Sequence, residues 1–198
     1  MIRERDGRLQ WHRCPFCRKA VPKAEEETKE LFIKRIEAND PVAICSMGTV
    51  RYNRGDYKAA FEYFTKAAAL GDIEAHYQLS CLYHEGEGVE KDEKKELHHT
   101  EQASIGGHPQ ARHNLGCFEG RKGRNDRAEK HYTITAKLGD DDSLNALQNG
   151  YKAGHVTKDD FTEALRGYQA AIEAMKSPQR EEAAEFARQV ADCEMRGI

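Results

Sequence analysis

Hydrophobic and small side chains recur along most of the chain at the spacing of an α-helix. Ala75, Leu79, Ser80 and Tyr83 follow an i, i+4, i+5, i+8 pattern, which places all four on one face of a helix. Residues 60–68 form a second stripe of this kind, rich in alanine and phenylalanine. Because small residues let two helices cross closely, these stripes predict helices that pack against one another.

A turn signal separates these helices and recurs through the chain. A small anchor residue follows it each time, at Ala43, Ala75, Ala111 and Ser143, so that the spacings are 32, 36 and 32 residues. A period of this length is typical of repeats in which each copy is a pair of antiparallel helices. The sequence therefore predicts about four copies of one helix-pair unit.

Each copy also carries the signals of a helix start. The expected N-cap positions of the first helices are occupied by Asp40, Asp72, His108 and Asp140. Pro41 and Pro109 follow at the first helical position, where a missing N–H has no consequence because that group lacks a helical partner. In the first unit we expect Asp56 to cap the second helix and Gly71 to end it.

Two stretches of the chain resemble known helical repeats. Residues 71–111, GDIEAHYQLSCLYHEGEGVEKDEKKELHHTEQASIGGHPQA, resemble a Sel1-like repeat. Residues 43–72, AICSMGTVRYNRGDYKAAFEYFTKAAALGD, are similar to the related tetratricopeptide repeat. The resemblance covers roughly residues 40–176. It departs from the family at Arg51 and Glu119, where Tyr is usual, and at His99, where Sel1 repeats often have Trp.

Periodicity and resemblance together predict an all-α fold, a right-handed α-solenoid of about four antiparallel helix pairs. A polar-backed helix at 177–198, starting at Ser177 and Pro178, is expected to cap the open end of the array. A charged linker or helix is expected at 23–39. The repeats themselves are expected at residues 40–71, 72–107, 108–139 and 140–176.

Near the start of the chain, the stretch WHRCPFCRKAVPK contains the pair Cys14 and Cys17. CPFCR with an upstream aromatic resembles the last ligand pair of a RING-type zinc finger, which implies a ubiquitin-ligase ancestry. A structural zinc site is a closed four-ligand tetrahedron, but the 13 residues before Cys14 offer only His12 as a further ligand. We therefore expect residues 1–22 to be an irregular remnant of such a finger. Zinc is expected only where another chain or an upstream segment completes the site.

The same Cys-Pro-Phe-Cys pair also resembles the dithiol of a glutaredoxin. That fold places an apolar strand just before the motif and continues in βαβ order. Residues 3–13, RERDGRLQWHR, do not form such a strand pattern, and helical repeats follow the pair. The sequence therefore disfavours a thiol oxidoreductase.

Composition narrows the classes of function. Charged residues make up 33% of the chain and the mean hydropathy is −0.86, which suits an elongated structure with much surface. The net charge of −3 does not predict a nucleic-acid partner. No apolar run approaches the roughly 20 residues of a membrane helix, so we expect no membrane partner and an intracellular, cytoplasmic or nuclear, location. Free thiols are expected at the dispersed Cys45, Cys81, Cys117 and Cys193.

Candidate catalytic patterns do not indicate an enzyme. His98 and His99 are neighbours whose side chains diverge by about 100° in a helix, and His76 and His84 are two turns apart. The zinc-protease, serine-hydrolase and phosphate-loop motifs do not occur. We expect no catalytic residue and no resident cofactor.

The predicted solenoid has a natural binding surface, because the first helix of each unit lines its concave side. Aromatic, amide and basic groups on such a wall suit an extended peptide or a partner helix. The sequence thus predicts a protein-interaction scaffold, the alternative being the substrate-recruiting part of a RING-type ubiquitin ligase with a truncated zinc domain. The candidate groove residues are Tyr52, Asn53, Tyr77, His84, His113, Arg121, Asn145, Asn149 and Lys152.

Overall fold

The structure, a computed structural model, describes residues 2–3, 9–10 and 25–176. Two short strands, β1 (Ile2–Arg3) and β2 (Leu9–Gln10), pair antiparallel. The rest of the described chain forms helices joined by turns and short loops. Its helices are α1 (Glu25–Glu37), α2 (Pro41–Asn53), α3 (Tyr57–Ala69), α4 (Ile73–Glu85), α5 (Glu93–Ile105), α6 (Pro109–Arg121), α7 (Asn125–Ala136), α8 (Asp141–Lys152) and α9 (Lys158–Met175).

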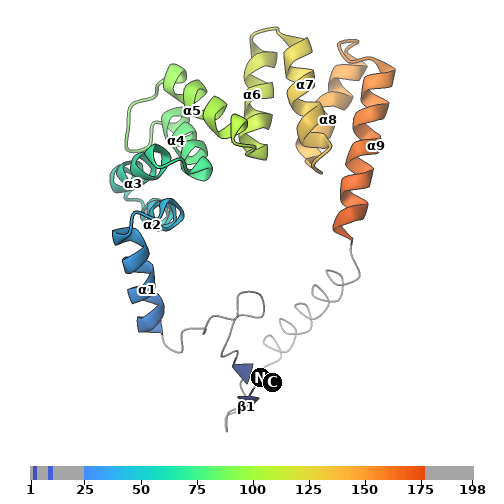
Figure 1. Ribbon diagram of the computed structural model, residues 1–198. Helices are drawn as coiled ribbons and strands as arrows, with labels where there is room; N and C mark the ends of the chain where they lie inside the picture. Colours follow the sequence, from blue (N-terminus) through green and yellow to red (C-terminus); the bar gives the residue numbers. More distant parts are fainter. Residues whose placement is uncertain (1, 4–8, 11–24, 177–198) are drawn as a thin grey trace, which may run out of the picture.

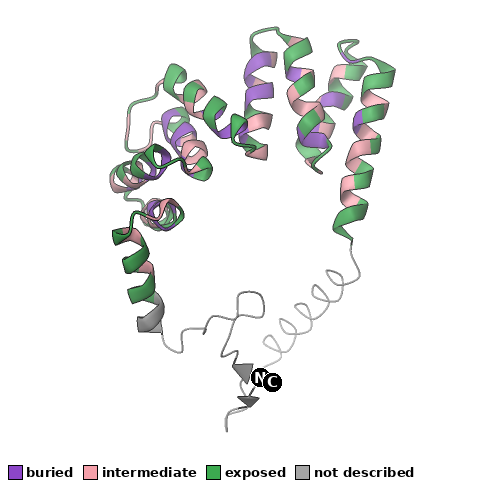
Figure 2. Cartoon of the chain, viewed as in Figure 1, coloured by how far each residue is buried: buried purple, intermediate pink, exposed green. Residues whose placement is uncertain are grey.

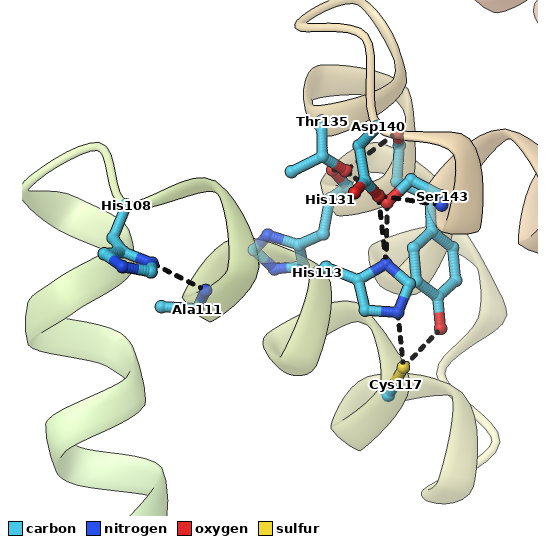
Figure 3. Close-up of polar contacts among 9 residues, drawn as sticks. His108, Ala111, His113, Cys117, His131, Thr135, Asp140 and Ser143 are labelled. Carbon is cyan, nitrogen blue, oxygen red and sulfur yellow. Dashed lines mark hydrogen bonds and ion pairs between the residues drawn. The ribbon is translucent and has the colours of Figure 1, made fainter. Parts of the chain in front are cut away.

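Side-chain caps set where the helices begin. The Asp72 carboxylate accepts a hydrogen bond from the Ala75 N–H at 2.7 Å, which satisfies one of the free donors at the start of α4. His108 does the same for α6, where its Nδ1 accepts from the Ala111 N–H at 3.2 Å (Figure 3). The predicted caps are confirmed at Asp40, Asp56, Asp72, His108 and Asp140.

The helices stack as hairpins into an arch (Figure 1). Each of α2, α4 and α6 packs chiefly on the helix that follows it, and α3, α5 and α7 make the contacts between successive hairpins. In Figure 1, α2 and α4 lie on the inner side of the arch, with α3 and α5 outside them. The predicted α-solenoid is confirmed in the described residues, and the predicted C-terminal capping helix lies outside them.

The core is a thin layer between the helices and not one central mass. Figure 2 shows the buried residues on the faces where helices meet, with exposed residues on the outer edges. Ile44, Phe64, Leu79 and Leu82 belong to the cluster that joins α2, α3 and α4. A second cluster joins α7, α8 and α9 through Ala136, Leu147, Val156 and Ala164. Each hairpin therefore depends on its neighbours to bury its apolar face.

Two glycines allow the paired helices to approach closely. A Cβ atom on Gly48 would lie 2.6 Å from the Phe64 ring, and one on Gly116 would lie 2.7 Å from the Tyr132 ring. Both distances are too short for a carbon contact. The two glycines are 68 residues apart and sit at matching positions in the first and third hairpins. In both hairpins, therefore, a glycine in the first helix leaves room for an aromatic ring of the second helix to pack against it.

Glu119 shows how the chain accommodates a departure from the repeat pattern. It stands where Tyr83 stands one repeat earlier, and it is buried. Its carboxylate accepts a hydrogen bond from Arg124 Nε, and Arg127 Nη1 lies 4.0 Å from it. The hydrogen bond and positive charge of Arg124 lower the pKa of Glu119. A cation supplied by the following turn and helix therefore replaces the apolar contacts of the aromatic ring.

Candidate functional site

A pocket of about 370 Å³ opens between α4, α5 and α6. The C-terminal halves of α4 and α6 form two of its sides, and α5 forms the third. The residues used below that line this α4–α6 pocket are Cys81 and His84 of α4, Glu96 and Leu97 of α5, and Cys117, Phe118 and Arg121 of α6. α4 and α6 are the first helices of successive units, the helices that the sequence predicts to line a binding groove.

The wall of the pocket combines apolar and charged groups. His84 Nδ1 lies 3.0 Å from Glu96 Oε1, so this pair ties α4 to α5 at one edge. The Arg121 guanidinium lies over the Phe118 ring, 5.8 Å from its centroid. Leu97 is half-buried, and Arg121 is exposed. The pocket thus offers apolar surface beside an accessible cation.

Cys117 is the centre of a polar cluster at the α6 side of this pocket (Figure 3). Its Sγ lies 3.4 Å from His113 Nε2 and accepts a hydrogen bond from the Tyr132 hydroxyl at 3.3 Å. The other ring nitrogen, His113 Nδ1, lies 2.7 Å from Ser143 Oγ and 3.4 Å from Asp140 Oδ2. We refer to these five residues as the Cys117 cluster.

The thiols of Cys45, Cys81 and Cys117 differ in the direction in which their surroundings shift the pKa. The hydrogen bond from His113, supported by that from Tyr132, lowers the pKa of Cys117, although burial acts in the opposite direction. Burial raises the pKa of Cys81, and it raises the pKa of Cys45 to about 12. All three are free, as the sequence predicts, and Cys14, Cys17 and Cys193 lie outside the described residues. Cys117 is therefore the described thiol with the most thiolate character.

Of the predicted groove residues, the structure brings His84 and Arg121 together in the α4–α6 pocket. Tyr77 is half-buried and stacks on the His108 ring at a centroid distance of 4.2 Å. Tyr52 is also half-buried, and it meets the Tyr57 ring edge-on at 5.1 Å. Four of the predicted residues are exposed, namely Asn53, Asn145, Asn149 and Lys152.

The structure places the remaining groove candidate, His113, beside Cys117. Its half-buried ring belongs to the Cys117 cluster, and the hydrogen bond with Cys117 raises the pKa of His113. The sequence analysis treated the cysteines as isolated thiols and so missed this pair. A local signal was present, because His113 and Cys117 are four residues apart and therefore adjacent on one face of α6.

A histidine contact was missed as well. The sequence analysis compared His76 with His84 and His98 with His99 and found that neither pair converges, whereas the structure places His76 against His99, with ring centroids 5.2 Å apart. These residues come from the two helices of one hairpin, α4 and α5. Spacing within a single helix could not reveal the contact, which depends on the register of the hairpin.

No group of three or more His, Cys, Asp or Glu side chains is arranged to hold a metal ion in the residues whose side chains the structure describes. The candidate zinc ligands Cys14 and Cys17 lie outside those residues. Among the described helices, none is long and apolar enough to cross a membrane.

Stacked antiparallel hairpins with capped starts and glycine-seated aromatic rings define this protein as an α-solenoid of the helical-repeat class. The Sel1 repeat model matches residues 41–72, 73–108 and 109–140, which together make up just over half of the chain. The chain belongs to the Sel1 repeat family. The matches correspond to the α2–α3, α4–α5 and α6–α7 hairpins, and α8 and α9 lie beyond them.

Two solved structures resemble this chain over most of its length. A Sel1 repeat protein from Oxalobacter formigenes is 28% identical with a TM-score of 0.64, over 78% of this chain and 66% of that one. The antigen c5321, a protective antigen of uropathogenic Escherichia coli strains with an SLR fold, is 26% identical with a TM-score of 0.60. That match covers 85% of this chain and 36% of the antigen.

A curated relative shares a shorter stretch. The putative beta-lactamase HcpC of Helicobacter pylori is 38% identical over 56 residues, which are 28% of this chain. The match spans 19% of the length of HcpC. Sel1 repeat proteins are generally scaffolds for protein–protein interaction, and nothing in the described residues shows catalysis.

Proposed function

We propose that this chain is a protein-interaction scaffold that takes one side chain of an extended peptide or partner segment into the α4–α6 pocket. The observation that carries the proposal is the meeting of His84 and Arg121, predicted separately as groove residues, in one pocket between successive repeats. A pocket of about 370 Å³ falls in the size range of ligand sites and can hold an amino-acid side chain.

The lining indicates the chemistry of the bound segment. Leu97 offers apolar surface to an aliphatic or aromatic side chain, and the buried ring of Phe118 lies in the wall of the same pocket. Beside that surface, Arg121 is exposed. Its guanidinium can pair with a carboxylate through two parallel hydrogen bonds. We therefore infer a partner sequence in which an apolar residue stands close to an acidic one.

Selection from a random peptide library displayed on phage, with the full chain as target, tests this function. Selected peptides are synthesised with a fluorophore and titrated by fluorescence anisotropy. Arg121→Glu reverses the charge at the pocket and should weaken binding by at least about tenfold, since like charges meet across the interface. Arg166→Glu makes the same change at an exposed position on α9 and should leave the affinity within about twofold.

Two results would contradict the proposal. One is the absence of any selected peptide consensus. The other is an equal loss of affinity in both variants, because that would assign the binding to net charge and not to the pocket.

The RING-type alternative rests on Cys14 and Cys17, outside the described residues, and is tested separately. Metal analysis of the purified full chain would support it by finding stoichiometric zinc that is lost on Cys14→Ser. If the purified protein contains no zinc and still binds the selected peptides, the result supports the scaffold function and contradicts the RING-type alternative.

A further inference from the structure

We propose that Cys117 is a nucleophilic thiol and the site at which a small disulfide, entering the α4–α6 pocket, forms a reversible mixed disulfide with the protein. This inference concerns covalent chemistry at one residue and does not depend on the peptide-binding function. It rests on the arrangement of the Cys117 cluster, on access through the pocket and on a comparison with Cys81.

The cluster has the three parts of an activated nucleophile. Cys117 Sγ is within hydrogen-bond reach of the imidazole of His113, at 3.4 Å from Nε2. The opposite ring nitrogen lies 2.7 Å from the Ser143 hydroxyl, which orients the ring, and 3.4 Å from the Asp140 carboxylate, whose negative charge favours the protonated form. A doubly protonated imidazole can then donate one N–H to the carboxylate side and the other to a thiolate (Figure 3).

Access to the sulfur comes from the pocket. Cys117 is half-buried within α6, and it lines the α4–α6 pocket together with Arg121 and His84. The pocket volume of about 370 Å³ accommodates a small disulfide but excludes a folded protein domain. The co-reactant is therefore a low-molecular-weight disulfide.

Cys81 provides an internal comparison at the matching position of the preceding repeat. It lies 36 residues before Cys117, the same shift that separates Ala75 from Ala111, and it lines the same pocket. The residue four positions before Cys81 is Tyr77, where Cys117 has His113. A phenol with a pKa raised to about 12 by burial cannot serve as the base at neutral pH. The two thiols thus share a pocket but not an activating imidazole.

The charged groups around Cys117 are consistent with a stabilised thiolate. From its own helix, the hydrogen bond with His113 and the charge of Arg121 lower the Cys117 pKa, and from α7 the Tyr132 hydroxyl acts in the same direction. From the start of α8, its N-cap residue Asp140 and Asp142 help raise the His113 pKa. Across the pocket, His84 and Glu96 are paired with each other.

The exchange step is balanced without any further reagent. The Cys117 thiolate attacks one sulfur of the small disulfide, a bond forms between Cys117 and that sulfur, and the original sulfur–sulfur bond breaks. The other half leaves as a thiolate and takes up one proton, so that one thiol and one disulfide yield one mixed disulfide and one small thiol. His113 is placed to supply this proton. Excess small thiol reverses the step.

Site-resolved alkylation of the folded full chain tests the nucleophile. With iodoacetamide, peptide mass spectrometry gives a separate rate for each cysteine between pH 5 and pH 10. Cys117 should react at least about tenfold faster than Cys81 at pH 7, with its half-maximal rate at a lower pH. In parallel, 2-hydroxyethyl disulfide should modify Cys117 first, and dithiothreitol should remove the adduct.

Two variants separate activation from simple exposure. His113→Tyr recreates the surroundings of Cys81 and should abolish the rate difference. Tyr132→Phe keeps the ring and removes only the hydroxyl, so it should raise the pH of the half-maximal rate while circular dichroism stays unchanged. The proposal is overturned if Cys117 in the unmodified sequence reacts no faster than Cys81, or if Tyr132→Phe and His113→Tyr, both folded, leave the Cys117 profile unaltered.

Discussion

His76 Nδ1 lies 3.0 Å from His99 Nδ1, so the two helices of the second hairpin meet through a pair of imidazoles. One ring can donate a hydrogen bond to the other only while at least one of them is neutral, because an imidazolium ion has no acceptor nitrogen; two imidazolium ions at this distance also repel each other. Burial is the largest cause that lowers the His99 pKa to about 4, with added effects from His76, His98 and Lys95. Burial lowers the His76 pKa too, although Asp72 opposes this shift.

This pair predicts a loss of stability in mild acid. A histidine whose pKa is lowered on folding takes up its proton more readily in the unfolded chain, so stability is retained above the unfolded value of 6.5. As the pH falls from about 6.5 to about 4, the free energy of unfolding should decrease. We expect a decrease of about 1–2 kcal/mol from His99, a figure reduced for its half-exposed position. Urea unfolding at a series of pH values measures it.

His99→Gln is the matched test of this assignment, because glutamine retains a donor and an acceptor but does not titrate in this range. The slope of unfolding free energy against pH between 6.5 and 4 should become shallower. His155→Gln, at an exposed position after α8, should leave the slope as it is. Identical slopes in all three proteins would refute the role of the imidazole pair.

Gly116 and Gly120 lie one turn apart on α6 and should respond oppositely to alanine. At Gly116 the added methyl group would meet the Tyr132 ring at 2.7 Å, and we expect a destabilisation of about 1–3 kcal/mol. At Gly120 the nearest atom is the Ala128 Cβ at 3.8 Å, an ordinary contact, so the gain in helix propensity should stabilise the protein by up to about 1 kcal/mol. Thermal and urea unfolding of both variants would show whether the signs differ, and a shared sign would contradict the close-approach argument.

The parts of the fold that the sequence predicted correctly are those set by local signals. The Asp72 carboxylate caps α4 and Ala75 is fully buried, as the position of each within the repeat indicates. These features depend on residues three or four apart and on a period that copies them. The all-α solenoid follows because one stable hairpin, repeated, has few other ways to bury its apolar faces.

The site was harder to predict because its contacts join different repeats. His113 and Cys117 share one helix face, but the carboxylate and hydroxyl that orient His113 come from Asp140 and Ser143 at the start of the next unit. Their meeting depends on how far one hairpin is rotated against the next. Spacing along the sequence does not contain that rotation, which the packing of side chains between hairpins determines.

The buried carboxylate of Glu119 yields a prediction about stability. Glu119→Gln keeps the shape of the side chain but removes the charge that pairs with Arg124 and Arg127. We expect the free energy of unfolding at pH 7 to fall by about 1–2 kcal/mol, less than for a pair buried on both sides. Glu163→Gln removes the charge of an exposed partner of Lys137 and should change the free energy of unfolding by less than about 0.5 kcal/mol. Equal effects in urea unfolding would mean that burial of Glu119 adds nothing to its pairing.

Modification of Cys117 should interfere with binding if both proposals hold, because the same pocket contains the thiol and receives the peptide side chain. Protein carrying one 2-hydroxyethyl group on Cys117 should bind a selected peptide at least about tenfold more weakly, since the adduct occupies volume and covers apolar surface. Dithiothreitol should restore the affinity. Cys117→Ser protein, given the same treatment, should bind equally before and after it. If mass spectrometry shows complete modification and the protein still binds with full affinity, the peptide binds elsewhere on the solenoid. That result would contradict the proposed binding pocket but not the reactivity of Cys117.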